Sequence, residues 1–170
     1  NPPIQTIRNP IYKTNLNELL KFVVENIFLR LSNPVRTIKF NLEFDDNLPL
    51  ISINEFVIWE IIEPLIQNSI DHSGTDIINI FIKTKYDKEK NLSILTIEDN
   101  GKGIDETLLE KDEHGIKKLF LENVTTKEEE KNRGYGCYIA YEIAKRCGWE
   151  LDAENKSEGG CIYKLIIRHN

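Results

Sequence analysis

The sequence predicts an α+β fold, a two-layer sandwich in which three main helices cover one face of a mostly antiparallel mixed sheet of about five strands. Some segments repeat apolar residues at i, i+3 and i+4, as helices with one buried face do, while others alternate apolar and polar residues, as half-buried strands do. Most of the strand segments come in pairs joined by short polar turns. This arrangement is typical of hairpins rather than of βαβ crossovers.

The length and composition are those of one folded domain. The chain has 170 residues, of which 40% are hydrophobic and 29% are charged, and its formal net charge is −6. This negative charge argues against a nucleic acid partner, and no apolar run reaches the length of about 18 residues that predicts a membrane span. We therefore expect no nucleic acid binding and no membrane contact by this domain.

The three cysteines, Cys137, Cys147 and Cys161, are odd in number and lack C-x-x-C spacing. This pattern argues against a disulfide framework and against a thiolate zinc site, and it favours a reducing compartment. We expect a cytoplasmic location for the domain, whether or not the parent protein is anchored in a membrane.

The N-terminal elements begin after a proline-rich segment. Residues 1–13 contain three prolines and no helical period, which predicts a connector from an upstream segment, with the domain itself over 14–170. A helix is expected from about Asn15, where Glu18 provides the partner of a capping box, and its apolar spacing continues to Leu31.

The central elements follow in the order strand, helix and hairpin. Residues 38–44 alternate as a strand, and Asn54–His72 form the second helix, in which Pro64 should cause a kink or a break. Ile77–Lys85 and Leu92–Glu98 flank a polar turn and predict an antiparallel pair.

The C-terminal elements are a region of weaker pattern, a helix and a hairpin. A short helix, interrupted by Gly115, is expected around Leu108–Phe120, and the third main helix runs from about Gly136 to Arg146. The last strands, Trp149–Asn155 and Cys161–Arg168, are joined by a glycine-containing turn.

Two glycine-rich segments have the composition of ligand-binding loops. Asp99 ends a strand and is followed by Gly101 and Gly103, so a carboxylate that can accept a hydrogen bond from an amine such as that of adenine lies beside a loop that a flat ligand can approach. Residues 134–136 open a helix, where free N–H groups favour an anion such as phosphate. Taken alone, each segment is equally consistent with an ordinary turn.

A polar edge on the second helix is the third candidate. Asn68, Asp71 and His72 lie at i, i+3 and i+4, and an amide oxygen such as that of Asn68 suits Mg²⁺. On the evidence of the helix alone, a solvent-facing edge is the simpler explanation.

Together, these segments resemble the ATP-binding catalytic domain of sensor histidine kinases, in the superfamily shared with type II topoisomerases, Hsp90 and MutL. The resemblance rests on four segments in order: Glu63–His72 resembles the N box, Asp99–Gly103 the G1 box, Leu119–Lys127 the F box with the threonine and lysine that follow it, and Gly134–Ala140 the G2 box. It implies a Bergerat-type ATP-binding fold, with ATP and Mg²⁺ as cofactors.

The resemblance also implies roles for individual residues. Asn68 would hold Mg²⁺ between the phosphates, and Asp99 would bind the adenine amine. Gly101 and Gly103 would shape the adenine pocket, with Ile104 against the base. The other implied cofactor-binding residues lie near the phosphates or the metal: Asp71, His72, Thr126, Lys127, Gly134, Tyr135 and Gly136.

Two glutamates are candidates for a catalytic carboxylate that polarises the acceptor or orders water. Glu60 lies two helical turns from Asn68 on the same face, whereas Glu63 projects about 140° away from Asn68 on an ideal helix. Solvent-facing helix glutamates are the alternative explanation for both.

The resemblance implies a histidine protein kinase that acts in two-component signalling. His72, His114 and His169 all lie outside the helical pair that carries the phosphoacceptor in this family, so we expect the acceptor on upstream dimerisation helices and a response regulator as a further partner. The alternatives are a degenerate pseudokinase module that binds a nucleotide or a partner, and a serine kinase of the same superfamily.

Overall fold

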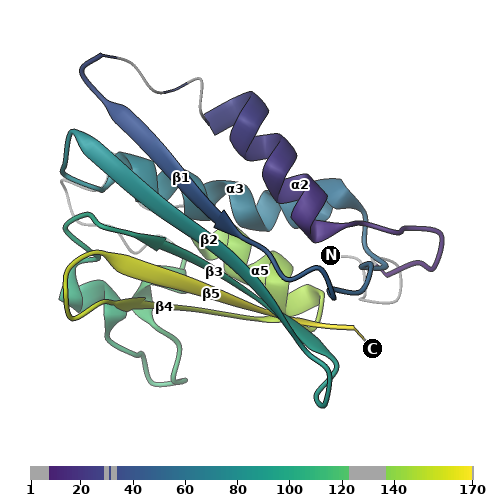
Figure 1. The fold of residues 1–170 in the computed structure, drawn as a ribbon. Coiled ribbons are helices and arrows are strands. Elements are labelled where there is room, and N and C mark those ends of the chain that lie inside the picture. The colour runs from purple at the N-terminus through teal and green to yellow at the C-terminus, as the bar shows by residue number, and fades with distance from the viewer. Residues whose placement is uncertain (1–7, 29–30, 32–33, 123–136, 170) are drawn as a thin grey trace.

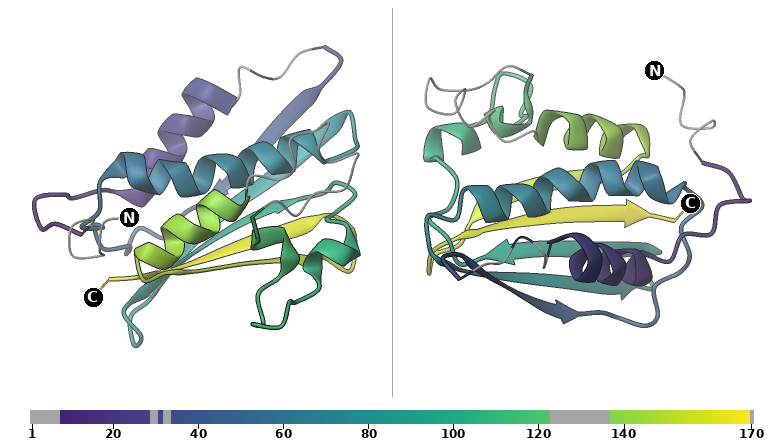
Figure 2. Two further views of the ribbon diagram at one scale, coloured as in Figure 1. Left: turned by 180° about the vertical axis from the view of Figure 1, so that it is seen from behind. Right: turned by 90° about the horizontal axis from the view of Figure 1, so that it is seen from above.

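The computed structural model describes residues 8–28, 31, 34–122 and 137–169. A single five-stranded sheet forms one layer, and three helices form the other, all on the same side of the sheet (Figures 1 and 2). The predicted α+β sandwich is confirmed. None of the helices in these ranges is long and apolar enough to cross a membrane.

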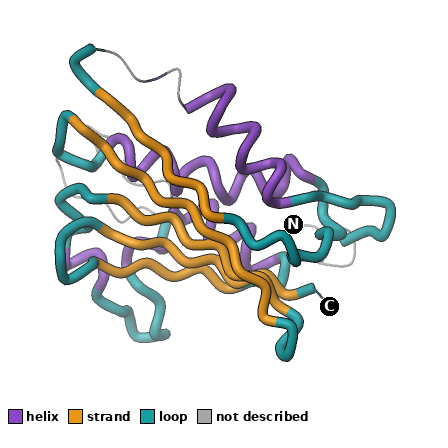
Figure 3. The backbone as a smooth tube through the Cα atoms, viewed as in Figure 1, coloured by secondary structure: helices purple, strands orange, loops and turns teal. Residues whose placement is uncertain are grey.

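The sheet has the strand order β1-β2-β3-β5-β4 (Figure 3). β1 and β2 are parallel because α3 connects them, and every other neighbouring pair is antiparallel. Both predicted hairpins, β2–β3 and β4–β5, are therefore present. The strand bounds are β1 Thr37–Glu43, β2 Ile77–Asp87, β3 Leu92–Asp99, β4 Glu150–Asn155 and β5 Cys161–Arg168.

The three helices begin close to the expected residues. Asn15 caps α2 by accepting a hydrogen bond from the backbone N–H of Glu18, at 3.1 Å, as its position predicts. The α-helical part of α2 ends at Val23, and one π-helical turn, η1, continues the chain to Phe28. The bounds are α2 Leu16–Val23, η1 Val24–Phe28, α3 Glu55–Asp71 and α5 Cys137–Arg146.

α3 continues through Pro64 without a break, so of the two expected effects of this proline, a kink or a break, the break is wrong. A proline inside a helix costs about 3 kcal/mol or more. The turns on both sides of it bury large apolar side chains, each of which stabilises the fold by about 1.5–3 kcal/mol. Burial therefore outweighs the cost of the proline; the buried residues are Ile61, Ile62, Leu65 and Ile66.

The segment between β3 and α5 forms two short 3-10 turns, η3 Glu106–Leu109 and η4 Lys118–Phe120, where one interrupted helix was predicted. Between them, Asp112 accepts hydrogen bonds from the backbone N–H groups of His114 and Ile116, at 2.8 and 2.9 Å. This side chain offers the backbone an alternative to the helical pattern, which explains the difference.

At the N-terminus, Arg8 and Thr14 form isolated antiparallel bridges with Ile53 and Ile51. The described residues before α2 therefore run beside the segment that leads into α3. The assignment of residues 1–13 as a connector stays a prediction.

Candidate functional site

The candidate site lies where the end of β3, the end of α3 and the β4–β5 turn meet. The loop after β3 crosses closely over the end of α3, because the Lys102 N–H donates to the Ser73 carbonyl at 2.8 Å. A Cβ on Gly101 would lie 2.6 Å from the Ser73 backbone, closer than side chains can approach. Glycine is therefore required at position 101, and the crossing places Asp99 near α3.

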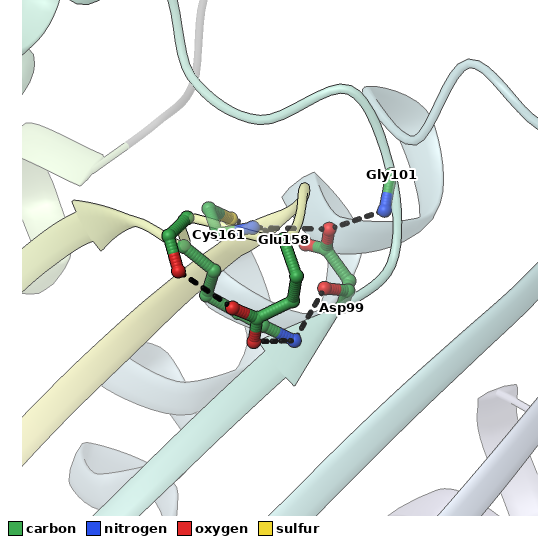
Figure 4. A network of polar contacts seen from close by, with 6 residues as sticks. Asp99, Gly101, Glu158 and Cys161 are labelled. Carbon is green, nitrogen blue, oxygen red and sulfur yellow. Dashed lines mark hydrogen bonds and ion pairs between the residues drawn. The ribbon is translucent and has the colours of Figure 1, made fainter.

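Asp99 is a buried carboxylate, only 3% exposed, with both oxygens engaged (Figure 4). Its Oδ1 accepts from the N–H groups of Gly101 at 2.9 Å and Cys161 at 3.4 Å, and its Oδ2 accepts from the Cys161 thiol at 3.1 Å. The Lys156 ammonium donates to the backbone carbonyl of Asp99 and pairs with Glu158. The carboxylate is thus oriented mainly by backbone N–H groups and a thiol.

A small cavity lies against this carboxylate. Its volume is about 10 Å³, which is room for roughly one water molecule. Pockets that hold drug-sized ligands measure about 300–1,000 Å³, so a purine enters only if the surrounding groups move. The lining residues are Asn68, His72, Asp99, Gly103, Ile104, Cys161 and Tyr163.

Five of the predicted site residues line this one cavity, although they come from segments far apart in the sequence: Asn68, His72, Asp99, Gly103 and Ile104. Gly101 lies beside them, hydrogen-bonded to Asp99. The predictions for Thr126, Lys127, Gly134, Tyr135 and Gly136 fall outside the described residues.

The other predicted residues do not line the cavity. Asp71 is exposed and accepts a hydrogen bond from the Gln67 side chain at 2.9 Å, which holds it on the outer side of α3. Glu60 is exposed and Glu63 is partly exposed. The cofactor role of Asp71 and the catalytic roles of the two glutamates stay predictions.

Asn68 is 6% exposed, and its amide nitrogen donates to the Cys137 sulfur at 3.1 Å. Burial raises the pKa of the Cys137 thiol to about 12, while hydrogen bonds with Tyr163 and Asn68 act in the opposite direction. The thiol is therefore neutral near pH 7. An amide oxygen is a ligand of the kind that Mg²⁺ takes.

Four residues of the site were missed by the sequence analysis: Asn155, Gly160, Cys161 and Tyr163. The Asn155 side chain pairs with Ile104, accepting from its N–H and donating to its carbonyl, both at 2.7 Å. Gly160 has a φ of +86°, and a Cβ there would collide with the Asp99 carbonyl. The consecutive glycines at 159 and 160 were the available signal for this close approach.

Cys161 and Tyr163 bring a thiol and a phenol to the cavity wall. Burial and then the charge of Asp99 raise the pKa of Cys161, and burial raises the pKa of Tyr163 well above its ordinary value. Both groups therefore stay protonated near pH 7, and the Cys161 thiol donates to Asp99. In the described ranges, no cluster of three or more His, Cys, Asp and Glu side chains is arranged to hold a metal ion.

Comparisons with known proteins agree with this geometry. The family described as "Histidine kinase-, DNA gyrase B-, and HSP90-like ATPase" matches residues 54–170. A sensor protein, KdpD of Clostridium acetobutylicum, is 27% identical over 150 residues, which are 88% of this chain and 16% of that protein. The chain therefore spans about 16% of the length of that relative.

Solved structures show the same fold. The nucleotide-free catalytic domain of the histidine kinase ThkA superposes with a TM-score of 0.70 at 24% identity, covering 92% of this chain and 95% of that one. Full-length ShkA in complex with AMPPNP superposes with a TM-score of 0.64 at 13% identity, covering 91% of this chain and 30% of that one.

Proposed function

Because this chain belongs to the histidine kinase-, DNA gyrase B- and HSP90-like ATPase family, we propose that it is the ATP-binding catalytic domain of a sensor histidine kinase. In this proposal it transfers the γ-phosphoryl group of ATP to a histidine on an upstream helical segment. The observation that carries the proposal is the buried carboxylate of Asp99 on the wall of a cavity that also contains Asn68.

Asp99 would accept a hydrogen bond from the exocyclic amine of adenine. Its Oδ1 keeps the hydrogen bond from the backbone N–H of Gly101, so the carboxylate stays oriented when a ligand approaches. Its Oδ2 accepts a hydrogen bond from the Cys161 thiol. We propose that the adenine amine replaces the thiol as the donor to this oxygen. A hydrogen bond to a charged acceptor is worth about 1.5–3 kcal/mol, more than one between neutral groups.

Asn68 would offer its amide oxygen to Mg²⁺, which keeps several waters and is shared with phosphate oxygens. When bound, this ion supplies neutralisation of the charge on the phosphates during phosphoryl transfer. A single protein oxygen fits this mode of binding, because Mg²⁺ in such sites rarely needs a cage of protein ligands.

The proposed function also requires a histidine that accepts the phosphoryl group and a signalling partner. His114 is exposed and His169 hydrogen-bonds Ser93 at 2.6 Å, and neither lies on one of the three main helices. As the family resemblance implies, we propose that the acceptor histidine lies on upstream dimerisation helices, with a response regulator as the next recipient, in the cytoplasm. The similarity to KdpD, a sensor protein, supports a role in signalling.

A second candidate is a degenerate pseudokinase module that binds a nucleotide or a partner, and the small cavity of about 10 Å³ favours its partner-binding form. One experiment separates the candidates: the protein with its upstream segment is incubated with γ-labelled ATP, and the bound label is tested with acid. Acid-labile label supports phosphohistidine. Acid-stable label indicates a serine or threonine kinase, and nucleotide binding without label indicates a pseudokinase.

A further inference from the structure

We propose that Lys156 is a positioning residue that fixes the place of the Asp99 carboxylate and thereby strengthens binding of a purine that carries an exocyclic amine. This rests on the proposed function, in which Asp99 accepts a hydrogen bond from the amine of adenine. Lys156 lies in the turn between β4 and β5 and does not line the cavity, so it acts through Asp99 and not on the nucleotide itself.

The β4–β5 turn depends on Lys156 because the rest of its backbone is permissive. Gly159 and Gly160 are consecutive and have φ values of +104° and +86°, a region that glycine adopts without strain. Both backbone groups of Lys156 close this turn. Its N–H donates to the Gly160 carbonyl at 2.9 Å, and its carbonyl accepts from the Gly159 N–H at 3.2 Å. The side chain of Lys156 therefore extends from the best-held residue of the turn.

The side chain of Lys156 ties this turn to the end of β3. Its ammonium donates to the backbone carbonyl of Asp99 at 3.3 Å and lies 5.9 Å from the centre of the Phe81 ring, within range of a cation–π contact. The ion pair with Glu158, at 3.8 Å, contributes less, because the Glu158 side chain is 70% exposed and water screens the pair. The Lys156 side chain is only 16% exposed, so the carbonyl and the ring hold its ammonium in place.

This anchor connects two contacts of Asp99 that lie on opposite sides of the residue. The Asp99 carbonyl packs so closely on Gly160 that a Cβ there would collide with it. The carboxylate accepts from the Cys161 thiol at 3.1 Å, and Cys161 follows the turn directly (Figure 4). A shift of the turn therefore moves both neighbours of Asp99 together. Because hydrogen bonds weaken steeply with distance and angle, such a shift misplaces the oxygen that accepts from the adenine amine.

The effect of this misplacement depends on the base of the nucleotide. Purine riboside triphosphate is ATP without the exocyclic amine, so it has the same phosphates and no donor for the Asp99 carboxylate at that position. A misplaced carboxylate weakens binding of ATP and leaves binding of this analogue nearly unchanged. A general loosening of the fold weakens binding of both nucleotides equally.

The experiment is isothermal titration calorimetry of the full chain with each of these two nucleotides in the presence of Mg²⁺. Lys156→Met keeps the aliphatic stem and removes the ammonium. We expect it to lower the affinity for ATP about 3–10-fold and the affinity for the analogue less than about twofold. Both affinities come from the same preparation, so their ratio does not depend on the fraction of folded protein. Lys164→Met is the matched control, because Lys164 is an exposed lysine of β5 that does not line the cavity.

An Asp99→Asn background tests whether Lys156 acts through Asp99. In this background the preference for ATP over the analogue is already reduced, because the charged acceptor is gone. Adding Lys156→Met should then change the ratio of the two affinities less than about twofold, since residues that act through one contact are not additive.

Two results would overturn the role of Lys156. One is an unchanged ratio of the two affinities in Lys156→Met, whether or not both affinities fall. The other is a further fall of the ratio when Lys156→Met is added to Asp99→Asn, which would place the effect outside Asp99. Failure of the proposed function is distinguishable, because the parent protein itself would then bind neither nucleotide or bind both equally.

Discussion

Substitution of Asp99 by asparagine tests the candidate site most directly. The change replaces one carboxylate oxygen with an amide nitrogen and removes the charge. The remaining oxygen can still accept from the Gly101 N–H, so we expect the fold to persist. The variant can no longer offer a charged acceptor to an amine, and an outward N–H group would face the donor hydrogens of adenine.

The size of the effect follows from this lost hydrogen bond. A bond to a charged group contributes about 1.5–3 kcal/mol, which corresponds to about a 10- to 150-fold change in Kd. At a nucleotide concentration about 100 times Kd, binding stabilises the parent by about 2.7 kcal/mol. For a chain of this size, this corresponds to a rise in Tm of about 5–11 °C. If the substitution weakens nucleotide affinity about 100-fold, the same nucleotide concentration should raise the Tm of the variant by only about 1–2 °C.

The assay is thermal unfolding of parent and variant with and without Mg²⁺ and ATP. Asp46→Asn is the control, because it makes the same chemical change at an exposed carboxylate remote from the cavity. A full nucleotide-induced rise in Asp99→Asn would refute the role of this carboxylate. A flat response of the parent at saturating ATP would reject nucleotide binding altogether.

Three further outcomes concern the support of the site and its stability. Gly160→Ala should lower the unfolding free energy by about 1–3 kcal/mol in urea denaturation, because the new Cβ meets the Asp99 carbonyl. Asn155→Ala should lower the unfolding free energy by about 1–3 kcal/mol in the same assay, because the backbone N–H and carbonyl of Ile104 lose their side-chain partner. Burial, assisted by a nearby arginine, lowers the pKa of His169. The pKa of His169 is lower in the folded state than in the unfolded state, so its contribution to the unfolding free energy is present above the unfolded pKa and is lost as the pH falls. The unfolding free energy should therefore decrease on acidification, and it should decrease less steeply in His169→Asn.

Each of these three predictions would be contradicted by a specific result. Unchanged stability in Gly160→Ala would mean that the β4–β5 turn does not pack on the Asp99 backbone. If Asn155→Ala unfolded like the parent, the loop after β3 would be held by other contacts. If His169→Asn retained the full loss of stability as the pH falls below about 6.5, the dependence would come from other groups.

Much of the secondary structure was predictable because it depends on local patterns. α3 lies within one residue of its predicted bounds, since Asn54 caps it and His72 follows it. The π-helical turn after Val23 and the continuity of α3 through Pro64 were not predictable. Both depend on packing of helix faces against a sheet assembled from distant segments, and no local propensity reports that packing.

Some residues of the site were likewise predictable from the sequence, and others became visible only in the tertiary structure. Asn68 and Asp99 were singled out by the order of the four motifs and the family resemblance that this order carries, because each segment alone is also consistent with an ordinary turn or a solvent-facing helix edge. The structure brings both residues to the wall of one cavity. Cys161 and Tyr163 look like ordinary core residues of an alternating strand. Only the register of β5 against β3 brings the Cys161 thiol to the Asp99 carboxylate and Tyr163 to the wall of the cavity, because contacts across a sheet depend on which strands pair and not on distance along the chain.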